Sequence, residues 1–286
     1  MAPQPFENLP RRGPLFFIAF MAAFAWLLSL PTYAAQAPVA PQPYLLHLNG
    51  IGGERSCDHW LLNGLRQGGF NAEVEVYDWT AGRVGIEALQ GQELHSAQSR
   101  KVAEKLTAFA RQHPNRPIYI TSHSGGCGVA VWALEQLPEN VKINTLVMFA
   151  PALSPNYDLS KALSHVTDRA YVFSSPHDTI VLGTGTKLFG TIDGLKVEAA
   201  GLNGFIQPDQ ADPAQYKKLS PHPYNKQWLA KYGNAGSHIC ALRPLFAREY
   251  VATLLLTGSA PADETPDTPV TATTQPVQPT RTSVLP

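Results

Sequence analysis

The segment 117–137 constrains the fold most strongly, because a short apolar strand runs into a serine-containing turn and then into a helix. The strand is PIYITSHS, and the helix, VAVWALEQL, ends before Pro138. Between them lies S-x-S-x-G at 122–126. A serine there needs a sharp, strained turn to project its hydroxyl above a sheet, and small residues two positions to either side relieve the crowding. The segment predicts a nucleophilic Ser124, with an ordinary glycine-rich turn as the alternative.

Strands and helices alternate along the rest of the central region. Strands are expected at 44–49, 72–79, 143–150 and 169–175, and helices at 57–67, 96–112 and 244–256. Such alternation gives a parallel sheet with helices on both faces. The strands are apolar without strict polar alternation, which agrees with burial on both sides. The sequence therefore predicts an α/β fold with a mostly parallel central sheet, in a single domain over 44–257.

The N-terminal region has the pattern of a secretory signal peptide over 1–37. Arg11 and Arg12 precede an apolar run, and an A-x-A sequence follows at 35–37. The run is shorter than the ~20 apolar residues of a spanning helix. Export to the periplasm or the medium is therefore expected, with an uncleaved membrane anchor as the alternative.

Two further segments are expected to lie outside the domain. Residues 38–43, PVAPQP, form a proline-rich spacer. Residues 258–286 are rich in proline and threonine, which predicts a disordered tail.

With its strand–serine–helix order, the stretch 44–257 resembles an α/β-hydrolase of the compact lipase, esterase and cutinase-like range. The resemblance implies a triad in the order serine, acid, histidine, each on a loop after a strand. Asp178 follows the strand that ends near Ser175, and His238 precedes the closing helix. The implied roles are nucleophile for Ser124, general base for His238 and orienting acid for Asp178.

Other carboxylates compete for the acid position. Asp193 lies farther past the same strand and stays an alternative. Asp168 precedes the strand, at the wrong edge of a parallel sheet. Asp78 follows a strand that comes before the nucleophile, so a turn or helix-cap role beside Trp79 is expected.

Other histidines compete for the base position. His222, with a proline on each side, is the alternative and is expected in a rigid loop of an insertion. His123 is expected to point away from the chemistry, and His47 to be a core histidine. Surface positions are expected for His95, His113, His165 and His177.

The resemblance also implies an oxyanion hole. Its donors would be the backbone N–H groups of Gly125 and of Ile51, in the run Asn49-Gly50-Ile51-Gly52-Gly53. Many lipases carry a histidine where this chain has Asn49, a difference that leaves the backbone donor intact but does not carry over a side-chain role for that histidine. A plain glycine-rich turn is the alternative.

The spacing limits any lid. Between Ser124 and Asp178 there is room for a helix, a strand, a helix and a strand, but not for a large cap. The segments 179–194 and 208–228 are expected to include an insertion over the site. Aromatic residues there would line an acyl pocket or form the insertion's core: Phe189, Phe205, Tyr224 and Trp228.

Three cysteines, Cys57, Cys127 and Cys240, match no zinc or redox motif. Because the resemblance brings their loops to one end of the sheet, a Cys57–Cys240 disulfide is a hypothesis for an exported protein. Three small buried residues are the alternative reading.

The predicted function is hydrolysis of carboxylic esters through an acyl-enzyme, with no metal or organic cofactor. The partner would be a small-molecule or lipid ester, the chain a monomer, and membrane contact limited to an uncleaved leader. Equal numbers of acidic and basic residues, 22 each, argue against a nucleic-acid partner. A peptidase or amidase on the same scaffold and a non-catalytic binding module are the alternatives.

Overall fold

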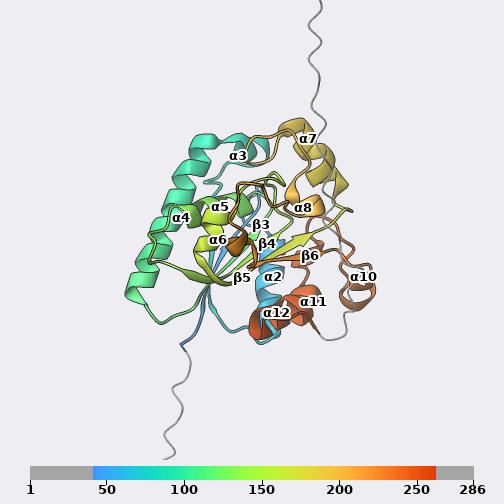
Figure 1. The fold of residues 1–286 in the computed structure, drawn as a ribbon. Coiled ribbons are helices and arrows are strands. Elements are labelled where there is room, and N and C mark those ends of the chain that lie inside the picture. The colour runs from blue at the N-terminus through green and yellow to red at the C-terminus, as the bar shows by residue number, and fades with distance from the viewer. Residues whose placement is uncertain (1–40, 262–286) are drawn as a thin grey trace, which may run out of the picture. The chain divides into compact units, whose positions relative to one another are not determined.

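The computed structural model describes residues 41–261 (Figure 1). The predicted signal peptide and nearly all of the predicted tail lie outside the described residues. Within the described part, no helix is long and apolar enough to cross a membrane.

The centre of the fold is a six-stranded sheet in the order β2-β1-β3-β4-β5-β6. Every neighbouring pair of strands is parallel. The strands are β1 (Tyr44–Leu48), β2 (Glu73–Tyr77), β3 (Ile118–His123), β4 (Ile143–Phe149), β5 (Val166–Ser174) and β6 (Leu219–Pro223). Because the strands are parallel, the loops that follow β1, β3 and β5 meet at one edge of the sheet.

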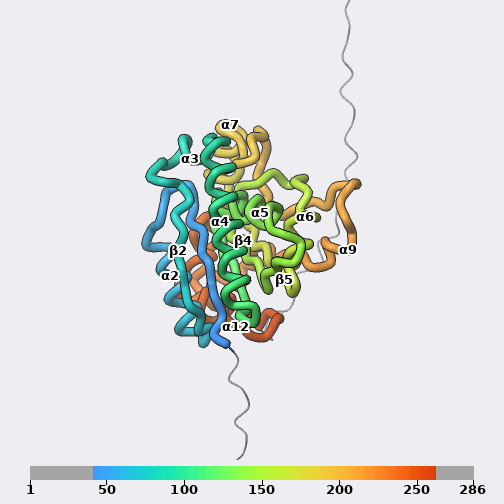
Figure 2. The backbone as a smooth tube through the Cα atoms, turned by 90° about the vertical axis from the view of Figure 1, so that its left-hand side faces the viewer, coloured from blue at the N-terminus to red at the C-terminus, as the bar shows by residue number. Residues whose placement is uncertain are grey.

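Two layers of helices cover the sheet (Figures 1 and 2). One layer comprises α4 (Gln92–Gln112), α5 (Gly126–Glu135) and α6 (Ser160–Ser164). The other comprises α2 (Ser56–Gln67), α10 (Gln227–Tyr232), α11 (Pro244–Phe246), the π-helical η3 (Ala247–Val251) and α12 (Ala252–Thr257).

Shorter elements lie in the connections. They are α3 (Ile86–Gln90), the π-helical η1 (Thr179–Gly185), α7 (Thr186–Phe189), α8 (Ala200–Asn203), α9 (Pro213–Tyr216) and the 3-10 turn η2 (Cys240–Leu242). In both views α3 and α7 lie side by side (Figures 1 and 2). A hydrogen bond of 2.9 Å from Gln90 Nε2 to the Phe189 carbonyl joins them.

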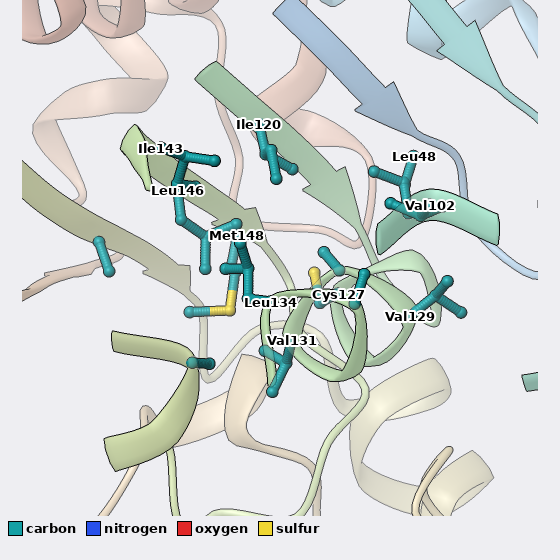
Figure 3. Close-up of a cluster of buried hydrophobic side chains, with 14 of the residues drawn as sticks. Leu48, Val102, Ile120, Cys127, Val129, Val131, Leu134, Ile143, Leu146 and Met148 are labelled. Atoms are coloured by element: carbon teal, nitrogen blue, oxygen red, sulfur yellow. The ribbon is translucent and has the colours of Figure 1, made fainter. Parts of the chain in front are cut away.

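The two cores follow from the alternation of side chains along each strand. On β4, Leu146 and Met148 face α5, and Figure 3 shows them with Ile120 and Leu134. The intervening Val147 and Phe149 face α2 and the closing helices. Since both faces are covered, neither set alternates with polar residues. The predicted α/β class, with a parallel sheet and helices on both faces, is confirmed.

The expectation of an insertion across 208–228 is wrong, because this segment contributes β6 to the sheet. Pro221 and Pro223 suggested a loop, since proline cannot donate to a strand ladder. β6 pairs only with β5, so its outer edge needs no donors, and an edge strand tolerates proline.

Gly126 sets the closest approach between α5 and the sheet. A Cβ at this position would collide with the Asn49 carbonyl oxygen and lie 2.7 Å from that of Leu48. Both are backbone atoms at the end of β1, so the strand would have to move. This explains the glycine at the last position of S-x-S-x-G.

We expect Gly126→Ala to lower the free energy of unfolding by about 1–3 kcal/mol, because it overpacks a backbone contact. Gly183→Ala is the matched control, since its nearest neighbours would be 3.8 and 3.9 Å away, and it should change stability by less than about 1 kcal/mol. Urea unfolding of both variants measures the difference. Equal stabilities would show that this contact does not limit the packing of α5.

Candidate active site

Ser124 occupies the turn between β3 and α5 in a strained conformation. Its φ is 53°, in the left-handed region that non-glycine residues rarely adopt. Its N–H donates to the Phe149 carbonyl at 2.9 Å, and its carbonyl accepts from Cys127 and Ala152. These three backbone hydrogen bonds hold the turn to β4 and to α5. The strain is therefore compensated by its surroundings, as is typical of functional positions.

His238 and Asp178 form a hydrogen-bonded pair. The distance from His238 Nδ1 to Asp178 Oδ2 is 2.6 Å, and the carboxylate is buried while the imidazole keeps partial access to solvent. An ionised carboxylate accepts the Nδ1 proton, so the second ring nitrogen, Nε2, is left to act as a base. Within the described residues, no hydrogen bond joins Ser124 Oγ to this ring.

Two contacts hold the His238 loop against the Asp178 loop. His177 Nδ1 donates to the Ala235 carbonyl at 3.3 Å. Gly236, at φ 77°, packs so closely that a Cβ would lie 2.6 Å from Ser175 Oγ. The acid loop therefore fixes the position of the histidine loop, although the two lie 60 residues apart.

Ser124 and His238 open onto one cavity of about 280 Å³, which also has Asp58 and Arg55 in its wall. The glycine-rich loop Gly50–Gly53, which includes Ile51, lines the cavity together with Val181 and Ile239. The first part of the predicted insertion, 179–194, thus contributes Val181 to the wall. The serine, the imidazole and an apolar pocket are brought together at the carboxyl edge of the sheet.

Gly125 and Ile51, whose amides are the predicted oxyanion donors, pack against each other. Neither N–H donates to another of the residues that the structure describes. The Ile51 side chain packs on Gly125, where a Cβ would lie 2.6 Å from Ile51 Cγ2. A side chain at position 125 would therefore crowd Ile51. The Gly125 N–H lies at the N-cap of α5, where the helix dipole favours negative charge.

Asn49 and Asp78 brace the loop that carries Ile51. Asn49 Nδ2 donates to the Gly50 carbonyl at 2.9 Å and to Asp78 Oδ1 at 3.2 Å. Asp78 also accepts from the Thr80 amide and hydroxyl, and Trp79 Nε1 donates to the Asn49 carbonyl at 2.7 Å. Asp78 is thus a turn carboxylate, as predicted, and Asn49 supports the loop rather than facing a substrate.

The prediction that His123 points away from the chemistry is wrong. The His123 side chain lines the same cavity, and its ring centroid lies 4.8 Å from that of His238. His123 Nε2 donates to the His238 carbonyl at 3.1 Å. Burial, followed by the nearby His238, lowers the pKa of His123 to about 3, so this ring is neutral at physiological pH. Sequence alone gave no sign that the His238 loop folds back onto the residue before the nucleophile.

The competing acids have other structural roles. Asp193 accepts from the Ser154 amide at 2.9 Å and from the Ser154 hydroxyl. Asp168 lies within β5 and accepts from Thr167 and Asn144. Neither is hydrogen-bonded to a histidine in the described part of the chain.

His222 lies in β6 and not in a loop. Its Nδ1 is 2.9 Å from the Tyr250 hydroxyl, and its ring packs on Phe173. Burial lowers the pKa of His222 to about 4. These contacts connect the edge strand to the closing helices. Among the described residues, no carboxylate is hydrogen-bonded to His222.

Three of the remaining histidines, His47, His95 and His165, are buried. His47 is a core residue, as predicted, hydrogen-bonded to Thr121 and to Asp58 at 2.9 Å. His95 and His165 were expected at the surface and are buried. His95 donates to the Ala88 carbonyl and stacks on Trp132, and His165 bonds to the Val141 carbonyl. Tertiary packing, which sequence does not reveal, decides both.

The cysteines form no disulfide, so the Cys57–Cys240 hypothesis is wrong for this structure. All three are free and buried. Cys240 Sγ is 2.9 Å from the Ser237 hydroxyl, whereas Cys57 faces the cavity. Cys127 packs under the turn, where burial raises its pKa to about 12. The alternative prediction, that the three cysteines are small buried residues, agrees with the structure.

The aromatic residues of the predicted insertion do not line the cavity. Trp228 and Tyr224 belong to the core beneath the closing helices, and Phe205 packs on the other core. Phe189 is exposed at the end of α7. In the described residues, no group of acidic, histidine or cysteine side chains is arranged to hold a metal ion.

No family model and no curated protein matches this chain. Solved structures that are similar to it include a dienelactone hydrolase from Anabaena variabilis, with 14% identity, coverage of 76% of this chain and 85% of that one, and a TM-score of 0.43. A cutinase-like protein from Cryptococcus has 12% identity, coverage of 79% and 100%, and a TM-score of 0.42. A Trichoderma reesei cutinase, solved with a phosphonate inhibitor, has 14% identity, coverage of 60% and 81%, and a TM-score of 0.34.

We expect His222→Gln to reduce the acid sensitivity of the fold. A histidine whose folded pKa of about 4 lies below the unfolded value of 6.5 makes the unfolded chain bind the extra proton. Native stability is then lost as the pH falls through this window, by up to about 2 kcal/mol between pH 7 and pH 5. Urea unfolding at the two pH values should show a smaller drop in the variant.

His113→Gln, at an exposed position, serves as the control and should keep the full drop of the unmodified protein. If His222→Gln shows that same drop, His222 takes up no proton on unfolding.

Proposed function

We propose that this protein is a serine hydrolase that cleaves carboxylic esters through an acyl-enzyme. One observation carries the proposal: Ser124, in a left-handed turn at the end of β3, shares a cavity with His238, whose Nδ1 is bound to the buried Asp178. A strained serine, an oriented imidazole and a buried carboxylate are the parts that acyl transfer needs.

In the proposed reaction, His238 Nε2 takes the proton of Ser124 as the hydroxyl oxygen attacks the ester carbonyl carbon. Asp178 keeps the imidazole in the required tautomer and stabilises the imidazolium that forms. The Gly125 and Ile51 amides donate to the tetrahedral oxyanion. His238 then protonates the leaving alcohol, and the acyl group stays on Ser124.

Water releases the acyl group by the same steps in reverse. His238 deprotonates the water, and the second tetrahedral intermediate collapses to the acid and free Ser124. The serine and the imidazole, which are not hydrogen-bonded in the structure, approach each other when substrate fills the cavity, since such contacts often tighten only in the complex. In this proposal, side chains and backbone amides of this chain supply the nucleophile, the proton transfers and the oxyanion donors.

We expect Ser124→Ala to abolish hydrolysis of p-nitrophenyl butyrate and labelling by a fluorophosphonate, because the attacking oxygen is gone. Loss of a triad serine costs roughly 10⁶ in kcat in worked protease cases. Circular dichroism should show that the variant is folded. Labelling that persists would assign the nucleophile to another residue.

Asp178→Asn and Asp193→Asn separate the two candidate acids. Asparagine at 178 favours the wrong imidazole tautomer, and we expect kcat to fall by about 10⁴, as in serine proteases. Asp193→Asn weakens only the hydrogen bonds to Ser154, so it should lower stability by about 1 kcal/mol and leave kcat within a few-fold. Ester kinetics and urea unfolding are the measurements. The reverse ranking in kcat would make Asp193 the acid.

A further inference from the structure

Arg55 contributes a cationic side chain to the wall of the cavity that contains Ser124 and His238. It is the residue immediately before α2 and is exposed to solvent. The rest of the wall comprises the glycine-rich loop, the apolar side chains of Ile51, Val181 and Ile239, and the residues Cys57, Asp58, Gly85, His123, Ser124 and His238. Among the described residues that line the cavity, Arg55 is the one that carries a permanent positive charge.

The backbone of Arg55 is held in place from the protein core. Its N–H donates to Asp58 Oδ2 at 2.7 Å, which caps the start of α2. Asp58 is itself buried and accepts from His47 at 2.9 Å. Because both oxygens of Asp58 are engaged, its carboxylate does not need the guanidinium as a partner.

The Arg55 side chain folds over Gly52. Its Nε donates to the Gly52 carbonyl at 3.2 Å, and a Cβ on residue 52 would collide with Nε and lie 2.7 Å from the guanidinium carbon. The glycine therefore makes room for the guanidinium beside the loop that carries the Ile51 amide. The side chain has a defined resting place next to the catalytic cavity.

The guanidinium has no anionic partner in the described part of the chain. Glu54, its neighbour in sequence, is 3.0 Å from His59 instead. No carboxylate among residues 41–261 lies within ion-pair distance of Arg55. Of the five N–H donors of a guanidinium, the described residues engage only Nε–H, so toward them the four on the terminal nitrogens are available.

We propose that Arg55 binds a carboxylate of the substrate, so that the preferred substrates are esters that carry a second, ionised carboxyl group. This inference rests on the proposed ester hydrolysis at Ser124. The planar guanidinium fork matches a carboxylate in a bidentate arrangement, which gives both energy and geometric specificity. The apolar wall suits the carbon chain between the ester and the carboxylate.

The test compares pairs of esters that differ only in charge. On the acyl side, the pair is mono-p-nitrophenyl adipate and its methyl ester, and on the alcohol side it is 4-(butanoyloxy)benzoate and its methyl ester. For each pair, the ratio of kcat/KM for the anionic ester to that for the neutral one is measured. The variants are Arg55→Gln, Arg55→Lys and, as a control, Arg83→Gln, which removes a cation that does not line the cavity.

For at least one pair we expect Arg55→Gln to lower this ratio by about ten- to a hundred-fold, the worth of a charge-assisted hydrogen-bonded pair. Arg55→Lys should retain part of the ratio, since an ammonium keeps the charge without the fork. Arg83→Gln should keep the ratio of the unmodified protein.

Two results would count against the inference and are distinguishable. If the unmodified protein hydrolyses the esters and is labelled at Ser124, but both ratios are the same in Arg55→Gln, the carboxylate site is refuted and ester hydrolysis stands. If no ester is hydrolysed and Ser124 is not labelled, the proposed function is refuted and the inference falls with it.

Discussion

The close approach of α5 to the carboxyl end of β1 is the constraint on which the site depends. Gly126 permits it, since any side chain there would strike the backbone of Leu48 and Asn49. Two residues before Gly126, Ser124 has a left-handed backbone conformation at the end of β3. The approach places the start of α5, with the free Gly125 amide, beside the loop that follows β1. This contact therefore brings the turn of Ser124 and the start of α5 close to the glycine-rich loop.

The parallel sheet adds the remaining groups at the same edge. β5 ends at Ser174, and the loop after it carries Asp178, which orients His238. His123 extends this arrangement, because it is the last residue of β3 and donates to the His238 carbonyl. Burial keeps His123 uncharged, so it can pack against the His238 ring without repulsion at neutral pH. The histidine loop is therefore tied both to the acid loop and to the serine turn.

Local pattern predicted the fold and the loops of the candidate site, because both follow from short-range rules. Strand–turn–helix order and small residues around Ser124 require only neighbouring residues, and parallel topology then brings the loops of Asp178 and His238 together. The structure agrees with that pairing, while the catalytic roles themselves stay predictions.

The errors concern features that depend on long-range packing. The prolines that flank His222 predict a loop, but an edge strand accepts them. The sequence predicts a surface position for His95, yet this residue lies between Trp79 and Trp132. The sequence also predicts that His123 points away from the site, because nothing near it in sequence reveals the His238 carbonyl. The cysteines share one end of the fold, but Cys240 bonds to Ser237 and Cys57 faces the cavity.

The crystal structure of the protein after reaction with an alkyl fluorophosphonate tests the central claim most directly. The account predicts phosphorus bonded to Ser124 Oγ, with the phosphoryl oxygen about 2.7–3.1 Å from both the Gly125 and the Ile51 nitrogens. It also predicts that His238 keeps its hydrogen bond to Asp178 and directs Nε2 at the adduct. An adduct on another side chain, or a phosphoryl oxygen that points away from both amides, would contradict it.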